Sequence, residues 1–366
     1  MTANVLLRGQ LRYLSEWFDI TVISSPGPEL DEVAVREGVR VIGIPIEREI
    51  AVTADARSLA RITRELRALK PHIINASTAK AGLLGMMAAA ALRISARIYQ
   101  LRGLRLETET GTKRAVLAAT ERIAAACAHR IICNSDSLRQ AYIAGGFAPA
   151  SKCVVLGAGS SNGVDLARFA RSADQQRHAC ELRGELGIAA DAPVIGFIGR
   201  PVADKGIGEL LTAFDRVRAA LPTARLVVVG AGFAGDRATD ELASRRDVVL
   251  VPRVAEPAPY YAMMDVLAFP SRREGFPNAP LEAAAAGVPT VGLRVTGVVD
   301  VVVHGETGRL VAPGDTRGFA DALFAYLENS ELRRSDGERA RSRAASQFAR
   351  ERVWEQARRA YEGFVP

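Results

Sequence analysis

The stretch Val266–Pro289 reads VLAFPSRREGFPNAPLEAAAAGVP, and it indicates the fold class of the whole chain. Its first five residues are apolar and predict a buried strand that ends at Pro270. Pro277 and Asn278 suit the start of a helix, which Gly287 then ends. A strand, a loop and a helix in this order are typical of one unit of an α/β fold.

Short apolar strands alternate with longer helical segments along the whole chain. In the first half the predicted strands are Phe18–Ser24, Val39–Ile44, His72–Ala76, Arg97–Leu101, Arg130–Asn134 and Cys153–Gly157. In the second half they are Val194–Gly199, Arg225–Gly230, Val248–Pro252, Val266–Pro270, Thr290–Leu293 and Arg309–Val311. Such alternation indicates βαβ units and parallel sheets.

The polar region Asp165–Ala192 is poor in β-forming residues and divides the chain in two. We predict one α/β domain over residues 1–170 and a second over residues 190–346, with a C-terminal helix over residues 347–366 that packs back on the first. The cleft between two such domains is the expected ligand site, at the carboxyl ends of the strands. The first domain opens with a helix-like segment, Ala3–Ser15, rather than with a strand.

Composition places the chain among globular proteins and limits its partners. Hydrophobic residues make up 48% of the 366 and charged residues 24%. The longest apolar run, Ala81–Leu92, is too short for a bilayer span of ~20 residues, and the charged N-terminus is unlike a signal peptide. We therefore expect a cytoplasmic protein. The net charge of +7 suits anionic partners or solubility alone, and the few aromatic residues argue against nucleic acid.

Residues that bind metals show no ligand spacing in this sequence. The four cysteines form no Cys-x-x-Cys pair, and reduced core thiols are the plain interpretation. The sequence also has no Asp-x-Asp that would clamp a metal and a diphosphate. We therefore expect neither a metal ion nor a cofactor.

Two carboxylates flank the predicted start of the helix after Pro270. Glu274 lies in the loop and Glu282 about one turn inside the helix, so both can face one crevice. The helix N-terminus offers free N–H groups to an anion. A carboxylate such as Glu282 can accept two hydrogen bonds from neighbouring ribose hydroxyls, and Glu274 can do the same for a sugar. A loop charge and a helix-dipole charge are the plainer interpretation of the pair.

A cationic stretch, Gly199–Gly206, also follows a strand and opens a helix. It reads GRPVADKG, and Arg200 and Lys205 are placed to neutralise a diphosphate in front of a helix N-terminus. Charged residues after a strand are common, so the stretch by itself is weak. Combined with Glu274 and Glu282, it supplies what is needed to hold a nucleoside diphosphate.

These stretches together resemble glycosyltransferase family 4, whose members have the two-domain GT-B fold and retain anomeric configuration. The family's Glu-x7-Glu motif is met at Glu274 and Glu282, and its Gly-Arg-x4-Lys-Gly motif at Arg200 and Lys205. The segment from Thr307 is also similar. Three N-terminal stretches are similar to the branch that builds capsule, O-antigen and related surface glycans: Ser77–Gly82, Arg102–Leu104 and Ser160–Asp165.

The resemblance implies a role for each matching residue. Arg200 and Lys205 would stabilise the leaving diphosphate, Glu282 would hold the ribose, and Glu274 would hold the donor sugar. The rest of the implied donor site is Gly275, Phe276, Pro277, Asn278 and Leu281. The acceptor-side candidates are Lys80, Arg102 and Asn162.

The resemblance also implies the substrates. The donor would be a nucleotide-diphosphate sugar, with UDP as the first expectation, and the acceptor a glycan or a polyprenyl-diphosphate-linked sugar. Front-face attack, with a donor phosphate oxygen taking the acceptor proton, requires no side-chain nucleophile and no metal ion. Contact with an anionic membrane is expected from a basic segment whose spacing places most of its charges along one predicted helical face: Arg57, Arg61, Arg64, Arg67 and Lys70.

One departure from the family keeps alternatives open. Family members normally begin with a strand and a Gly-rich loop, whereas this sequence begins with Ala3–Ser15, so a central strand of the first sheet is expected to be lacking. The alternatives are a protein that binds nucleotide without transfer and a GT-B nucleotide-sugar epimerase. A remote one is an NAD-dependent dehydrogenase, because Gly230–Gly235 matches G-x-G-x-x-G.

Overall fold

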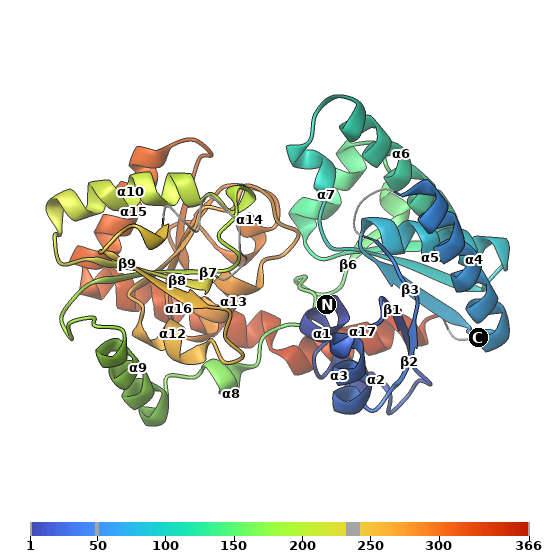
Figure 1. Cartoon of the computed structure of the whole chain (residues 1–366), viewed down its shortest axis with the longest axis horizontal. Helices are drawn as coiled ribbons and strands as arrows, with labels where there is room; N and C mark the ends of the chain where they lie inside the picture. The colour runs from blue at the N-terminus through green and yellow to red at the C-terminus, as the bar shows by residue number, and fades with distance from the viewer. Residues whose placement is uncertain (1, 48–50, 232–241, 365–366) are drawn as a thin grey trace. The chain divides into compact units, whose positions relative to one another are not determined.

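The computed structural model describes residues 2–47, 51–231 and 242–364, which form two compact units (Figure 1). Unit 1 comprises Met1–Gly163 and Arg350–Pro366, and unit 2 comprises Val164–Ala349. Each unit is an α/β structure whose described strands all pair in parallel. All twelve predicted strands are present, which confirms the predicted α/β class.

Unit 2 contains one six-stranded sheet. Its strands are β7 (Val194–Ile198), β8 (Arg225–Ala231), β9 (Val248–Pro252), β10 (Val266–Phe269), β11 (Thr290–Leu293) and β12 (Gly308–Val311). Their order in the sheet is β12-β11-β10-β7-β8-β9. The chain therefore builds outward from β7 on one side and then resumes at β10 on the other. In such sheets the crevice where the order reverses is the usual ligand position.

Helices cover both faces of the unit 2 sheet (Figure 1). The described helices of unit 2 are α8 (Leu166–Phe169), α9 (Ala173–Glu185), η3 (Ala203–Lys205), α10 (Ile207–Ala220), α12 (Ala258–Met263), α13 (Asn278–Ala285), α14 (Val298–Val301), α15 (Thr316–Glu328) and α16 (Ser330–Phe348). One core cluster joins the sheet to α10 and α15, with Phe197, Phe214, Phe319 and Tyr326 almost fully buried. Burial of such large apolar side chains is the main stabilising contribution in a sheet of this kind.

The strands of unit 1 form two separate sheets. A pair, β1 (Thr21–Ser24) and β2 (Arg40–Gly43), stands apart from the four-stranded sheet β3-β4-β5-β6. The strands of the larger sheet are β3 (Ile73–Ser77), β4 (Ala96–Leu101), β5 (Arg130–Cys133) and β6 (Cys153–Val155). In the described part of the chain no strand joins β1 to β3. Ile23 and Ile74 nevertheless pack against the same hydrophobic cluster.

The helices of unit 1 surround these strands. They are α1 (Thr2–Leu6), α2 (Gln10–Leu14), α3 (Pro28–Glu37), α4 (Val52–Leu69), α5 (Ala79–Ala91), η1 (Arg105–Thr108), α6 (Gly111–Cys127), α7 (Asp136–Ala144), η2 (Ala150–Lys152) and α17 (Arg350–Glu362). The last of these, α17, lies in unit 1 and contacts α2. Across the described ranges of both units, no helix is both long enough and apolar enough to cross a membrane.

The predicted helix Ala3–Ser15 is wrong in one respect, because it is broken into α1 and α2. Gly9 stands between them with φ 80°, a left-handed conformation that glycine adopts at no steric cost. A Cβ atom at Gly9 would lie 2.8 Å from the Trp354 ring. The Gly9 N–H also donates to the Glu37 carboxylate at 3.0 Å. These contacts with distant residues are not visible in the local helical pattern.

Candidate functional site

The two sequence-predicted clusters meet at the point where the strand order of unit 2 reverses. The Arg200 and Lys205 loop follows β7, and the Glu274 loop follows β10. Because β7 and β10 are parallel neighbours, with Val266 opposite Ile195, their carboxyl ends lie side by side. The strand order therefore supports the central prediction that the cationic cluster and the carboxylate cluster lie close together.

The loop after β7 is held close to the end of β10. Gly206 ends η3 and caps α10 with φ 74°, and a Cβ atom there would lie 2.2 Å from the Pro270 carbonyl oxygen. Any other residue would force the two segments apart. The side chain of Lys205 is thereby carried to the carboxyl end of β10, whereas Arg200 lies exposed in the same loop. Within the described ranges, no hydrogen bond or ion pair involves the Arg200 side chain.

Glu274 is bound through one of its two carboxylate oxygens. Its Oε1 accepts from Lys205 Nζ at 2.5 Å and from Ser271 Oγ at 2.7 Å. The Ser271 side chain is buried, and the Glu274 side chain is 14% exposed. Behind this loop, Gly297 has φ 78°, and a Cβ atom there would lie 2.7 Å from the Gly275 carbonyl carbon. The loop backbone is thus fixed while Glu274 Oε2 keeps no partner within the described ranges.

Glu282 is held in the same way by a residue of another helix. It lies in α13, and its Oε2 accepts from the Tyr261 hydroxyl of α12 at 2.8 Å. Tyr261 is fully buried and packs edge-on against Phe169, with ring centroids 5.6 Å apart. Burial raises the pKa of Glu282 to about 7, and the Tyr261 hydrogen bond only partly offsets this effect. In the described part of the chain, Glu282 Oε1 has no partner.

The other predicted donor-site residues lie around the start of α13. Pro277 occupies its N-cap position and Asn278 its first turn, with no side-chain cap for the helix N–H groups. Phe276 and Leu281 are buried, and the Phe276 ring packs 5.2 Å from that of Phe348. Phe276 and Leu281 therefore shape the loop and the helix, while free N–H groups remain for an anion.

The three acceptor-side candidates differ in their surroundings within unit 1. Lys80, at the start of α5, pairs with Asp55 of α4 at 2.7 Å. The Asn162 amide joins two chain-distant segments, because it donates to the Arg8 carbonyl and accepts from Trp354 Nε1. Arg102 follows β4, and its Nε and Nη1 atoms are buried without a partner among the described residues.

Two residues that hold the site were missed from the sequence. Ser271 lies two residues after β10, and its position three residues before Glu274 was a usable signal. The sequence carried no signal for Tyr261, because this residue reaches Glu282 from a preceding helix through tertiary packing alone.

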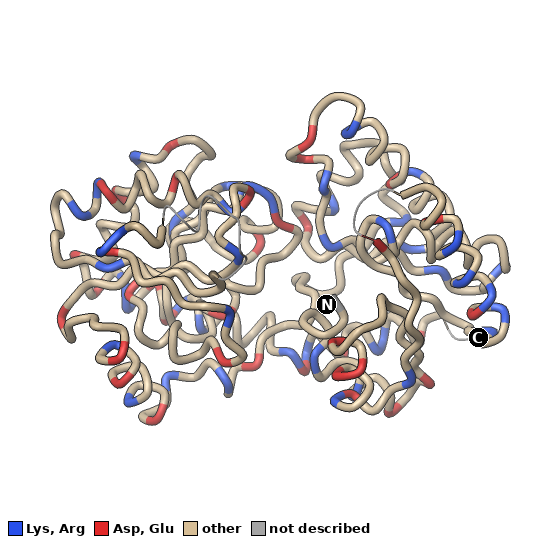
Figure 2. Tube along the Cα trace, in the orientation of Figure 1, with Lys and Arg blue, Asp and Glu red and all other residues tan. Residues whose placement is uncertain are grey.

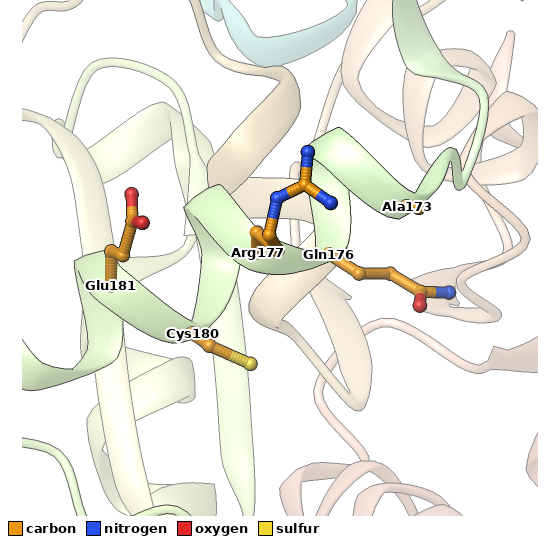
Figure 3. A pocket seen from close by; sticks show the side chains of 5 residues that line it. All are labelled: Ala173, Gln176, Arg177, Cys180 and Glu181. Atoms are coloured by element: carbon orange, nitrogen blue, oxygen red, sulfur yellow. The ribbon is translucent and has the colours of Figure 1, made fainter.

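Other features do not add to this site. The hollow in Figure 3 lies along α9 and is lined by Ala173, Gln176, Arg177, Cys180 and Glu181, none of which was predicted to bind donor. The G-x-G-x-x-G stretch lies partly outside the described residues. Its first residue, Gly230, packs against the Gly199 carbonyl. Within the described ranges no three or more metal-binding side chains cluster together.

Comparison with known proteins gives matches in both units. Residues 192–329 match the family described as glycosyl transferases group 1, and residues 3–159 match a glycosyl transferase 4-like domain. The capsular polysaccharide biosynthesis glycosyltransferase CapM of Staphylococcus aureus is 36% identical over 98% of this chain and 94% of its own length. N-acetyl-alpha-D-glucosaminyl L-malate synthase of Bacillus anthracis is 33% identical over 49% of this chain and 47% of its own length.

A solved structure gives the same result for the fold. HepE of Anabaena, crystallised with UDP, superposes with a TM-score of 0.80 at 20% identity, covering 99% of this chain and 96% of HepE. Fold and strand order define a GT-B protein with two Rossmann-like domains. The chain belongs to the group 1, family 4-like glycosyltransferases, and it is an enzyme of the glycosyltransferase class. The dehydrogenase alternative is thereby set aside.

Proposed function

We propose that the enzyme moves a sugar from a UDP-sugar to a glycan or lipid-linked acceptor in surface polysaccharide synthesis, with retention of anomeric configuration. The name of the relative CapM supports the capsular context. HepE has been crystallised with UDP and with UDP-glucose, which supports UDP as the nucleotide. The epimerase alternative has no such support.

The observation that carries this proposal is the state of the two carboxylates. Glu274 and Glu282 each have one oxygen held by the protein and one without a partner in the described part of the chain. A carboxylate oxygen fixed in this way is ready to accept from a ligand hydroxyl without losing rotamer freedom on binding. Glu282 accordingly binds the ribose, and Glu274 binds the donor sugar.

The cationic loop binds the diphosphate. Lys205 presents three N–H donors, of which Glu274 uses one, and the exposed Arg200 adds a planar fork of donors. The α10 N-terminus behind them has no side-chain cap. Donors aimed at the diphosphate gain strength as it leaves, because negative charge then develops on its oxygens.

The transfer step needs no side-chain nucleophile. The bond between the anomeric carbon and the diphosphate oxygen breaks, and UDP leaves with the electron pair. The acceptor hydroxyl oxygen bonds to the anomeric carbon on the same face, and its proton passes to a phosphate oxygen of the departing UDP. Arg200 and Lys205 neutralise the negative charge that develops on UDP, so we propose that no metal ion is required.

Basic residues along α4 and at its C-terminal end support contact with an anionic membrane. All of them are exposed: Arg57, Arg61, Arg64 and Arg67 lie in the helix, and Lys70 caps it. Figure 2 marks the charged positions of both units along the chain. Clustered arginines contribute about 1 kcal/mol each near an anionic surface. Co-sedimentation with vesicles that contain phosphatidylglycerol, and none with phosphatidylcholine vesicles, is the expected result.

A screen of nucleotide sugars tests the proposal. A bound donor raises the apparent melting temperature by mass action, and UDP-sugars are expected to do so at lower concentration than GDP- or ADP-sugars. A stabilising donor is then incubated with the enzyme and candidate acceptors, and the anomeric configuration of the product is read by NMR. Stabilisation by no UDP-sugar would refute the donor assignment, and an inverted product would refute retention.

A further inference from the structure

Arg102 is a partly buried cation of unit 1 for which the described residues show no ion-pair partner. Arg102 immediately follows β4 and therefore lies at the carboxyl edge of the four-stranded sheet. Its Nε and Nη1 atoms are shielded from solvent, and neither donates to any acceptor among the described residues. Buried polar groups in native proteins nearly always have partners, so an orphaned guanidinium indicates a missing ion or ligand.

Arg97, an arginine within β4, shows what a structural role looks like here. Arg97 donates from Nε to the Cys127 carbonyl at 2.6 Å and from Nη1 to the Ile94 carbonyl at 2.8 Å. Both interactions tie β4 to its neighbours. Arg102 makes no comparable bond within the described ranges, so it does not stabilise unit 1 in this way.

The surroundings of Arg102 provide a second donor. Tyr361 of α17 lies close enough for the Arg102 charge to lower the pKa of its hydroxyl, although burial raises that pKa by more. The Tyr361 oxygen accepts from Asn75 Nδ2 at 2.5 Å, which leaves its own proton free to donate. Burial lowers the pKa of Arg102 to about 10, so the guanidinium stays charged at neutral pH. A cation and a hydroxyl donor therefore stand together at the sheet edge.

We propose that Arg102 and Tyr361 bind a phosphate group carried by the sugar acceptor. A tetrahedral phosphate has enough oxygens to accept from two donors on different elements, and arginine is the residue best suited to bind it. This inference rests on the proposed function for the acceptor, but its residues belong to unit 1, whereas the donor residues belong to unit 2. Lys80 and Asn162 are not part of it, because their own contacts occupy them.

Inorganic phosphate is the probe for a binding test. The full chain is first saturated with UDP, so that phosphate cannot report on the donor site, and phosphate is then titrated at constant ionic strength by calorimetry. Wild type is expected to bind phosphate and not acetate. Arg102→Gln is expected to bind at least about tenfold more weakly, and Tyr361→Phe to lose less, because hydrogen bonds to charged groups contribute more than neutral ones. As the control, Arg40→Gln removes one exposed charge at the start of β2, and it is expected to retain wild-type phosphate affinity.

Stability separates a ligand site from a structural role. Without phosphate, Arg102→Gln is expected to melt at or above the wild-type temperature, because it removes an uncompensated buried charge. A lower melting temperature, equal phosphate affinity in Arg102→Gln and wild type, or no phosphate binding by wild type would each overturn the proposal. In the transfer assay, phosphate that competes with the acceptor supports an acceptor-borne group, and non-competitive inhibition contradicts it.

The proposed function can fail independently of this inference. If UDP does not bind at all, the donor assignment fails, and phosphate is titrated into the nucleotide-free chain. Loss of the phosphate signal in Arg102→Gln but not in Lys205→Met would then still support the unit 1 site.

Discussion

The ammonium of Lys205 and the carboxylate of Glu274 lie 2.5 Å apart, although 69 positions separate them in the chain. The side chains are 27% and 14% exposed, so the pair is accessible to a ligand. Such a partly exposed ion pair contributes little to stability, so we assign it a role in donor binding rather than in folding. In the donor complex we expect Lys205 to keep Glu274 oriented with one N–H while the others bind phosphate oxygens.

Ser271 is expected to act through Glu274 rather than on the substrate directly. Ser271→Ala removes the 2.7 Å hydrogen bond and leaves Glu274 held by Lys205 alone. A hydrogen bond to a charged group is worth about 1.5–3 kcal/mol, so kcat/KM should fall by roughly ten- to a hundredfold. UDP without its sugar should bind as in wild type, because Glu274 contacts the sugar. Weaker UDP binding by Ser271→Ala would contradict this division of roles.

Donor affinity is expected to depend on the protonation of Glu282. Burial raises the pKa of this carboxyl to about 7, and only the ionised form accepts on both oxygens. UDP affinity should therefore rise with pH through about 7 and level off above it. Tyr261→Phe removes a donor to the carboxylate, so the pKa rises further and the transition moves to higher pH. Calorimetric UDP titrations from pH 5.5 to 9 measure both.

A control variant separates the pH dependence that Glu282 causes from the pH dependence that ionisation of UDP causes. The terminal phosphate of UDP also ionises near neutral pH, and its contribution is present in every variant. Glu282→Gln should retain the contribution of the UDP phosphate and lose the rest of the pH dependence. Glu328→Gln, which removes an exposed charge on α15, should show the same pH dependence as wild type. Identical profiles for Glu282→Gln and wild type would exclude Glu282 as the titrating group.

The stability of unit 1 is expected to fall as pH rises because of Glu121. This carboxyl is buried beneath Tyr99 and Tyr142, whose hydroxyls donate to its Oε2 at 3.0 and 3.1 Å. Burial raises its pKa to about 7 from 4.5. The folded state thus binds the proton more tightly than the unfolded state, so the stabilisation is full below about 4.5 and is lost as pH rises through about 7.

Glu121→Gln tests this directly. In wild type the free energy of unfolding should fall by on the order of 3 kcal/mol from this group between pH 4.5 and 8. The variant should show a flatter profile in urea titrations at pH 5 and pH 8. Glu328→Gln, at an exposed position, should show the wild-type dependence of the free energy of unfolding on pH. A slope unchanged in Glu121→Gln would show that the carboxyl does not titrate in this range.

Removal of divalent metals is expected to leave transfer intact. Arg200 and Lys205 supply positive charge at the diphosphate, so excess EDTA should change kcat/KM less than twofold once donor and acceptor are known. Restoration of a lost activity by Mg²⁺ or Mn²⁺ would instead show that a metal ion shares this charge.

Strand positions were predictable because they depend on local apolar runs. Each predicted strand is found within a few residues of its expected bounds, including β7 and β10, which carry the site. The strand order was not predictable, because it depends on which edges pair after the helices pack. The break between α1 and α2 at Gly9 was not predictable either, since it depends on tertiary contacts with Trp354 and Glu37.

The site was predictable in part for a related reason. Arg200, Lys205, Glu274 and Glu282 stand in recognisable spacing after strands. The structure brings Lys205 into contact with Glu274, and the convergence of all four side chains on one ligand stays a prediction. Residues that hold them through tertiary contact, such as Tyr261, carry no local pattern.

The most direct test of the account measures UDP binding to two variants drawn from the two loops. Calorimetry at pH 8 with Lys205→Met and Glu282→Gln should show UDP affinity at least about tenfold below wild type in each, since each loses a charged partner of the ligand. Arg216→Met, an exposed charge on α10, should bind UDP as wild type does. Wild-type affinity in both loop variants, with the fold intact by circular dichroism, would contradict the convergence of these residues on one nucleoside diphosphate.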